Sequence, residues 1–344
     1  MKYHFRNLVF EGGGVKGIAY IGALSVLEQK GVLQNIKRVG GTSAGAIVAL
    51  LLALDFSVAE IKEILWTMNF ERFLDSSWGV IRDTERLLKD FGWYKGDYFQ
   101  NWIGDLVEQK TGSRLTTFLE LDNLKLRRQL YLIGTNLSTG FAEIFSHMHS
   151  PEMTLVEGVR VSMSIPLFFT AVRNKYKDVC VDGGALENYP IKLFDRRSYI
   201  DRHFRTTDYY NEVNGHGNIN EMSAYVFNME TLGFRLDSWN EIKMFEGLEK
   251  PEHYEIRDFF DYIKRLITTL LDSQQNRHLH SDDWQRSVYI DSLGIKTTDF
   301  EISEAQKNAL VEAGILGTEK YFNWFESTKD NITNRPRGYY DIIG

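Results

Sequence analysis

The chain has 344 residues, enough for a sizeable core, and its 43% hydrophobic and 25% charged residues are typical of a globular protein. A formal net charge of −7 argues against nucleic acid as a partner and against general attraction to anionic bilayers. The single cysteine, Cys180, excludes an internal disulfide and a cysteine-based metal site, and it suits a reducing compartment. No apolar run reaches the roughly 18 residues of a spanning helix, and we expect no signal peptide.

The first predicted strand, residues 7–11, ends in a glycine-rich turn, Gly12-Gly13-Gly14-Val15-Lys16-Gly17, and a helix follows it. Two functions fit this turn. Its glycines match the G-x-G-x-x-G fingerprint of dinucleotide-binding folds. Alternatively, its backbone N–H groups form an oxyanion hole, which stabilises the tetrahedral intermediate of acyl transfer. The acidic residue that the fingerprint requires about 20 positions further on is missing, and this favours the oxyanion hole. Lys37 or Arg38 could still accept an NADP phosphate, so an NADP-binding Rossmann protein stays an alternative.

The second predicted strand, residues 36–39, leads into Gly41-Thr42-Ser43-Ala44-Gly45 and then into an apolar helix over residues 46–54. This is the pattern of a nucleophile elbow, G-x-S-x-G, in which a serine stands on a tight strand-to-helix turn. Gly41 and Gly45 leave room where a Cβ atom would clash, and the turn raises Ser43 above the sheet. The plainer alternative is a loop of small residues that caps the helix.

A third motif, Val181-Asp182-Gly183-Gly184-Ala185, follows the glycine turn and the elbow in the order typical of the patatin-like phospholipase family. The chain resembles that family over about residues 5–240, and residues 134–140, 161–169 and 231–237 are also similar to family segments. The family consists of lipid acyl hydrolases that use a Ser–Asp dyad without histidine. The resemblance implies that Ser43 is the nucleophile and Asp182 the general base. It further implies an oxyanion hole of Gly12, Gly13, Gly14 and Val15, with motif support from Lys16, Gly17, Gly41, Gly45, Gly183 and Gly184.

The dyad sets a chemical requirement on Asp182. A free aspartate, with a pKa of about 3.9, is too acidic to be a good base, so we expect this carboxyl to be partly desolvated. The two dyad residues are 139 positions apart, so only the fold can join them. The resemblance implies neither a metal nor a cofactor.

The segments between the motifs read as helices and strands. Residues 55–125 have a helical pattern and many aromatic residues, most of which we expect in the core, although an apolar lid over the serine is the alternative. Residues 130–135 read as a buried strand and residues 154–164 as a helix. A β-like run over 175–181 then leads to Asp182.

Histidines support two competing interpretations. G-x-S-x-G is also the signature of Ser-His-Asp esterases of the α/β-hydrolase type, and His203 or His216 could complete such a triad. Neither lies in a recognisable catalytic segment. His147 and His149 could suggest a metal site, but no cysteine or carboxylate cluster accompanies them.

The predicted fold is a three-layer α/β/α arrangement of the patatin-like type, with a mostly parallel central sheet, a helical insertion and a helical C-terminal portion. We expect helices over 259–271 and 303–325 with a strand over 288–295 between them. We predict one domain over residues 5–330, with its core motifs within 7–190, and a surface tail over 331–344.

The sequence therefore predicts a lipid acyl hydrolase of the phospholipase A type, which cleaves membrane phospholipids through an acyl-Ser43 intermediate. We expect a cytoplasmic protein that makes peripheral contact with membranes. A patatin-fold binding or regulatory protein that has lost turnover is the alternative from outside the enzymes.

Overall fold

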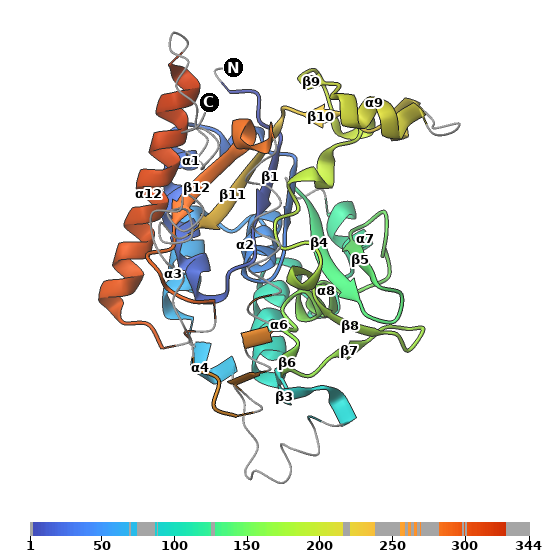
Figure 1. The fold of residues 1–344 in the computed structure, drawn as a ribbon, viewed down its shortest axis with the longest axis vertical. Helices are drawn as coiled ribbons and strands as arrows, with labels where there is room; N and C mark the ends of the chain where they lie inside the picture. Colours follow the sequence, from blue (N-terminus) through green and yellow to red (C-terminus); the bar gives the residue numbers. More distant parts are fainter. Residues whose placement is uncertain are drawn as a thin grey trace.

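The structure is a computed structural model (Figure 1) that describes residues 3–68, 70–73, 87, 89–124, 128–215, 221–237, 255–258, 261–262, 265–266, 269, 282–297, 299 and 301–327. The strands are β1 (Asn7–Phe10), β2 (Arg38–Gly41), β3 (Gly92–Tyr94), β4 (Gln129–Asn136), β5 (Phe141–Phe145), β6 (Leu167–Phe169), β7 (Val172–Arg173), β8 (Val179–Asp182), β9 (Phe204–Arg205), β10 (Phe227–Asn228), β11 (Thr231–Asp237) and β12 (Ser287–Asp291). The α-helices are α1 (Ala19–Gln29), α2 (Ala44–Ala53), α3 (Val58–Thr67), α4 (Phe70–Phe73), α6 (Asp97–Thr111), α7 (Phe118–Asn123), α8 (Leu155–Ser162), α9 (Asp208–Gly215) and α12 (Glu304–Glu326).

The central sheet is mixed and mostly parallel. Strands β12, β11, β1, β2 and β4 lie side by side and are parallel throughout, whereas β5 and β8 pair with β4 antiparallel and β7 pairs with β8. Two small sheets, β9 with β10 and β3 with β6, lie outside it. The predicted fold class, an α/β fold with a mostly parallel central sheet, is confirmed.

Helix α2 lies at the centre of the larger hydrophobic core. All ten of its residues, AGAIVALLLA, are buried, as expected for a helix that is apolar all round. It packs against β1, β2 and β4 and also contacts α8. Because α2 begins directly after the β2 turn, the first residues of this helix lie at the carboxyl edge of the parallel strands.

The C-terminal helix α12 packs against α1 and β12, so the two ends of the described chain meet (Figure 1). Glycines allow a close approach: a Cβ atom on Gly22 of α1 would lie 2.0 Å from the Val311 carbonyl oxygen, and one on Gly314 of α12 would lie 2.0 Å from the Ala19 carbonyl oxygen. Either side chain would therefore separate the helices. The helix begins where the sequence indicates, since Ser303 forms a capping box with Gln306.

The other face of the sheet carries a second, smaller hydrophobic cluster. Val9 and Tyr131 pack there against Tyr189, Ile191 and Phe194, which come from the segment that follows Asp182. Short 3-10 turns rather than long helices form this segment. The chain downstream of the third motif therefore covers the face of the sheet that α2 does not cover.

Some of the other predicted elements lie within the described residues and some lie outside them. The strand predicted over 130–135 is β4, the helix over 154–164 is α8, and the strand over 288–295 corresponds to β12. Most of the predicted helix over 259–271, and the whole tail over 331–344, lie outside the described residues. Within the described ranges, no helix combines the length and the apolar character needed to cross a bilayer.

Candidate active site

Strand β4 brings Ser43 and Asp182 together. Its Leu132 pairs with Gly41 of β2 and, on the opposite edge, with Phe145 of β5. Two positions further on, Gly134 pairs with β5 again and with Asp182 of β8. Strands β2 and β8 therefore occupy the same edge of β4 and approach each other head-on. The last residue of β8 meets the turn that follows β2.

Ser43 occupies a strained backbone position at that turn. It has φ +54° and ψ −124°, a left-handed conformation that is costly for a residue with a side chain. The neighbouring glycines hold the turn closed, because a Cβ atom on Gly41 would lie 2.4 Å from the Gly45 backbone and one on Gly45 would lie 2.3 Å from the Phe10 carbonyl oxygen. The Ser43 N–H donates to Ser162 Oγ at 3.1 Å. This is the geometry of a nucleophile elbow.

The Ser43 and Asp182 side chains are only 4% and 2% exposed. Asp182 Oδ1 accepts the Gly184 N–H at 2.7 Å, whereas the buried Oδ2 has no hydrogen-bond partner among the residues that the structure describes. Ser43 Oγ points to Met163 Sδ at 3.6 Å, yet the hydroxyl lies close enough to Asp182 to lower the pKa of that carboxyl. The Ser43 hydroxyl is therefore the neighbouring group that can donate to Oδ2.

Burial dominates the electrostatics of Asp182. It raises the pKa of this carboxyl from 3.8 to about 7, and the Gly184 N–H and the Ser43 hydroxyl oppose that rise. Near neutral pH, then, the carboxyl can both accept and return a proton. This agrees with the desolvation expected of a general base.

The glycine turn lies against the elbow. A Cβ atom on Gly12 would lie 3.0 Å from the Ser43 Cβ, and the Gly12 N–H already donates to the Asn188 carbonyl oxygen at 3.1 Å. Within the described part of the chain, the N–H groups of Gly13, Gly14 and Val15 donate no hydrogen bond. Three of the four predicted oxyanion-hole residues thus keep a free donor.

Gly14 is a position where only glycine fits. Its φ is +55°, and an added Cβ atom would lie 2.1 Å from the Thr297 carbonyl oxygen. Lys16, in the same turn, is a buried lysine whose Cε would contact a Cβ on Gly13 at 3.3 Å. Gly17 faces the start of α2, since its Cβ would lie 3.0 Å from the Ala44 Cβ. The turn, the elbow and α2 thus form one tightly packed unit.

Sequence reasoning missed Asn188 and Glu11, which support the glycine turn. Asn188 Nδ2 donates to the Gly12 carbonyl oxygen at 3.1 Å and lies 3.4 Å from Glu11 Oε1, so Asn188 holds both polar groups of the Gly12 backbone. Glu11 Oε2 accepts the Leu236 N–H at 2.7 Å, and burial raises the pKa of Glu11. A carboxylate at the end of an apolar strand was the only sequence signal for Glu11, and Asn188 had none beyond its closeness to Asp182.

The histidine alternatives lie elsewhere. His203 packs against His4, with ring centroids 4.6 Å apart and the rings tilted. His4 precedes β1, so this pair lies at the amino end of that strand, whereas Ser43 follows the carboxyl end of β2. His216 lies outside the described residues. His149 Nδ1 is 2.8 Å from Ser146 Oγ. In the ranges that the structure describes, no three His, Cys, Asp or Glu side chains gather as a metal ion would require.

Comparison with known proteins decides the family. Residues 8–195, more than half of the chain, match the family described as Patatin-like phospholipase. The chain belongs to this family. The uncharacterized protein YqhO of Bacillus subtilis, 31% identical over 326 residues, shares the similarity over 91% of this chain and 96% of its own length.

One further relative and one solved structure extend the comparison beyond the patatin motifs. The cGAMP-activated phospholipase of Escherichia coli is 24% identical over 298 residues, which cover 82% of this chain and 75% of that protein. Among solved structures, VipD from Legionella pneumophila has a TM-score of 0.59 at 18% identity, over 93% of this chain and 67% of VipD. The VipD likeness supports the patatin-like fold along almost the whole chain, and patatin-like proteins are serine lipid hydrolases.

Proposed function

We propose that the protein is a lipid acyl hydrolase of the phospholipase A type, with Ser43 as nucleophile and Asp182 as general base. The observation that carries the proposal is the head-on approach of β2 and β8 along one edge of β4. It sets a strained serine beside a buried carboxylate, directly next to free backbone N–H groups. A structural loop has no need of this combination, whereas acyl transfer needs all three parts.

Acylation is the first half of the reaction. Ser43 Oγ turns from Met163 towards Asp182 Oδ2 and gives its proton to this oxygen while it attacks the ester carbonyl carbon. The carbonyl oxygen takes up the negative charge, which the N–H groups of the Gly13–Val15 turn stabilise. The C–O bond to the glycerol then breaks, and the leaving alkoxide takes the proton from Asp182. The products are acyl-Ser43 and a lysophospholipid.

Deacylation reverses the roles of the partners. Asp182 takes a proton from water as the water oxygen attacks the acyl carbon, and the same N–H groups hold the second oxyanion. When the bond to Ser43 Oγ breaks, the proton returns from Asp182 to the serine and a free fatty acid leaves. Every proton moves through one carboxyl, so no histidine and no metal takes part. Oδ1 stays fixed by the Gly184 N–H, which leaves Oδ2 as the oxygen that exchanges protons.

Release of fatty acid from phospholipid vesicles tests the proposal. We expect hydrolysis by the wild type, loss in Ser43→Ala and Asp182→Asn, and unchanged hydrolysis in His203→Ala, which removes the competing triad histidine. A fluorophosphonate should label Ser43 in the wild type and in His203→Ala. A folded wild type that neither releases fatty acid nor reacts with the fluorophosphonate would contradict the proposal and favour a binding or regulatory protein.

A further inference from the structure

Two turns project beyond the active-site edge of the sheet. Strand β4 continues past the Asp182 level at Gly134 and ends at Asn136, where it turns back into β5. Strand β8 runs the opposite way and starts at the same end, after the β7–β8 turn. With about 3.3 Å per residue, both turns reach roughly 10 Å beyond Asp182. They project side by side in Figure 1, and the Leu137 N–H joins them by donating to the Val179 carbonyl oxygen at 2.8 Å.

The two turns expose large apolar side chains and cations. Leu137, Phe141 and Tyr176 are 54%, 72% and 72% exposed, and Arg173, Lys175 and Lys177 are exposed beside them. We call these six residues the hairpin face. Clustered exposed apolar side chains mark an interaction site more strongly than scattered ones. The cations are notable in a chain whose net charge is −7.

Hydrogen bonds hold both turns in one conformation. Asn136 Oδ1 accepts the N–H groups of Ser138 and Thr139, and Asn174 Oδ1 accepts those of Tyr176 and Asp178. The amide groups of both asparagines donate to Asp178 Oδ2, at 3.0 and 3.2 Å, which ties one turn to the other. The apolar tips are therefore ordered before any partner arrives, and binding does not have to order them.

The acidic groups nearby are less exposed than the cations and accept hydrogen bonds from within the turns. Asp178 accepts from the two asparagine amides, and Glu143 Oε1 accepts the Asn136 amide at 2.7 Å. The Arg173 guanidinium instead donates to the Lys177 carbonyl oxygen at 3.2 Å and lies 5.7 Å from the centre of the Phe91 ring. Three exposed cations therefore stand against two half-buried carboxylates, and the net charge of the two turns is positive.

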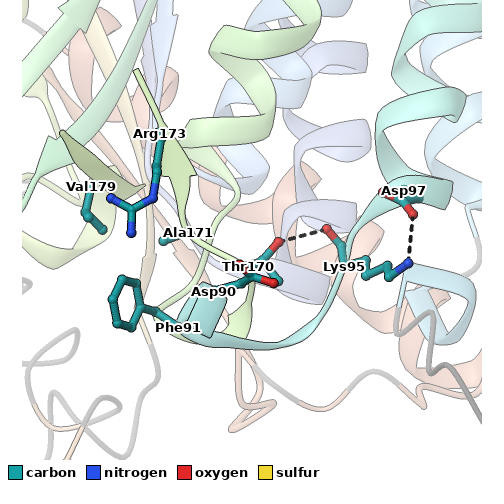
Figure 2. A pocket seen from close by; sticks show the side chains of 8 residues that line it. All are labelled: Asp90, Phe91, Lys95, Asp97, Thr170, Ala171, Arg173 and Val179. Atoms are coloured by element: carbon teal, nitrogen blue, oxygen red, sulfur yellow. Dashed lines mark hydrogen bonds and ion pairs between the residues drawn. The ribbon is translucent and has the colours of Figure 1, made fainter. Parts of the chain in front are cut away.

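A cavity of about 400 Å³ borders the hairpin face on the β7 side (Figure 2). Arg173 and Phe91 line it together with Asp90, Lys95 and Asp97, and Lys95 pairs with Asp97 at 4.0 Å. Its two carboxylates offset its two cations, so the cavity is not itself an anion site. Phe91 adds one more exposed ring at its rim.

We propose that the hairpin face docks the protein on a lipid bilayer with anionic headgroups. Leu137, Phe141 and Tyr176 enter the interfacial layer, and the three cations contact the headgroups. Because the face lies on the same edge of the sheet as Ser43, docking brings the bilayer to the active-site side. This inference rests on the proposed function only for what the docked enzyme then does; the docking itself can be measured without hydrolysis.

The test is vesicle sedimentation with the Ser43→Ala protein, so that the lipid stays intact. The vesicles contain phosphatidylcholine mixed with phosphatidylserine, or phosphatidylcholine alone. At roughly 1 kcal/mol per cation near an anionic surface, Lys175→Gln with Lys177→Gln should weaken binding to the mixed vesicles about 30-fold at low salt. Phe141→Ser with Tyr176→Ser should weaken binding to both kinds of vesicle.

Matched controls carry the same chemical changes on other surfaces. Lys62→Gln with Lys320→Gln removes the same charge, and Tyr209→Ser with Leu316→Ser removes comparable exposed apolar groups. Control variants that bind like the parent, while the face variants bind less, would support the proposal. Equal losses of binding in the control and face variants would overturn it. Face variants that bind vesicles as well as the parent would also overturn it, and would favour a protein partner for this face.

Hydrolysis separates this inference from the proposed function. With Ser43 intact, the face variants should hydrolyse a soluble short-chain ester as fast as the wild type does. They should release less fatty acid than the wild type from mixed vesicles. If the wild type hydrolyses the soluble ester and the face variants lose none of their vesicle activity, docking by this face is wrong while the proposed chemistry stands. If the face variants lose vesicle binding but the wild type cleaves neither ester nor phospholipid, docking by this face stands and the proposed chemistry is wrong.

Discussion

Replacing Asp182 by asparagine should stabilise the folded protein while it abolishes hydrolysis. Burial raises the pKa of Asp182 from 3.8 to about 7, so the fold disfavours the ionised carboxylate that the unfolded chain carries at neutral pH. At about 1.4 kcal/mol per pKa unit, this difference corresponds to roughly 4 kcal/mol above pH 7. Asparagine keeps an oxygen that can accept the Gly184 N–H but carries no charge.

The sign of the pH dependence follows from proton binding. The folded state holds the Asp182 proton more tightly than the unfolded state, so the wild type loses stability as the pH rises from about 4 to about 7. The variant has no proton to lose there. The stability difference should therefore grow by roughly 4 kcal/mol across this window and stay level above it. Glu11, whose pKa burial also raises, titrates in both proteins and cancels in the difference.

Urea unfolding of both proteins at about pH 5 and about pH 8 should show roughly 2.5 kcal/mol of this growth, because part of it already lies below pH 5. Asp97→Asn, at a carboxylate whose side chain is 68% exposed, is the matched control and should leave the free energy of unfolding within about 0.5 kcal/mol of wild type. Any constant cost of burying the new amide changes the free energy of unfolding equally at both pH values. The change of the stability difference with pH is therefore the decisive quantity. A difference that is flat or shrinks between the two pH values, or hydrolysis that survives in Asp182→Asn, would refute the reasoning.

Three further predictions concern the site and its support. The kcat/KM of the wild type should rise with pH through an apparent pKa near 7, because Asp182 must be ionised to act as base; a profile that falls with pH over this range contradicts the assignment. Gly14→Ala should abolish hydrolysis or folding, because its φ is +55° and its Cβ would lie 2.1 Å from a carbonyl oxygen, so a variant with wild-type activity and melting temperature would disprove this packing. Arg286→Met should lower the free energy of unfolding by about 3–5 kcal/mol in urea titrations, because it leaves the buried Asp195 carboxylate without its cation. The control Arg257→Met, at an exposed ion pair, should cost under about 1 kcal/mol. Equal costs in the two variants would contradict the larger value.

Local features of the fold were predictable because their causes lie within a few residues. The elbow follows from glycines on both sides of Ser43, and α8 begins at Thr154, which forms a capping box with Glu157. The apolar run after the elbow predicts a buried helix, and α2 is one. In each case the chemistry that forms the element is contiguous in the sequence.

Long-range features were not predictable from spacing. Nothing near Asp182 indicates that β8 runs antiparallel into the end of β2, since this depends on the length of β4 beyond Leu132. The hydrogen bond from Asn188 to the Gly12 carbonyl oxygen joins residues 176 positions apart. Only the resemblance to a family placed Asp182 beside Ser43 in advance. The catalytic roles of both residues, and one domain over residues 5–330, remain proposals.

The position of β11 has a consequence for how the protein is made. Strand β1 has β2 on one edge soon after it emerges from the ribosome, but its other edge waits for β11, with Asn7 opposite Thr231. These residues are 224 positions apart, which at about 5–20 residues per second corresponds to roughly 10–45 s of synthesis. Throughout that interval an apolar strand edge is unpaired and open to pairing with another chain. Slower translation or a shortage of chaperones should therefore lower the soluble yield long before it affects the stability of the folded protein.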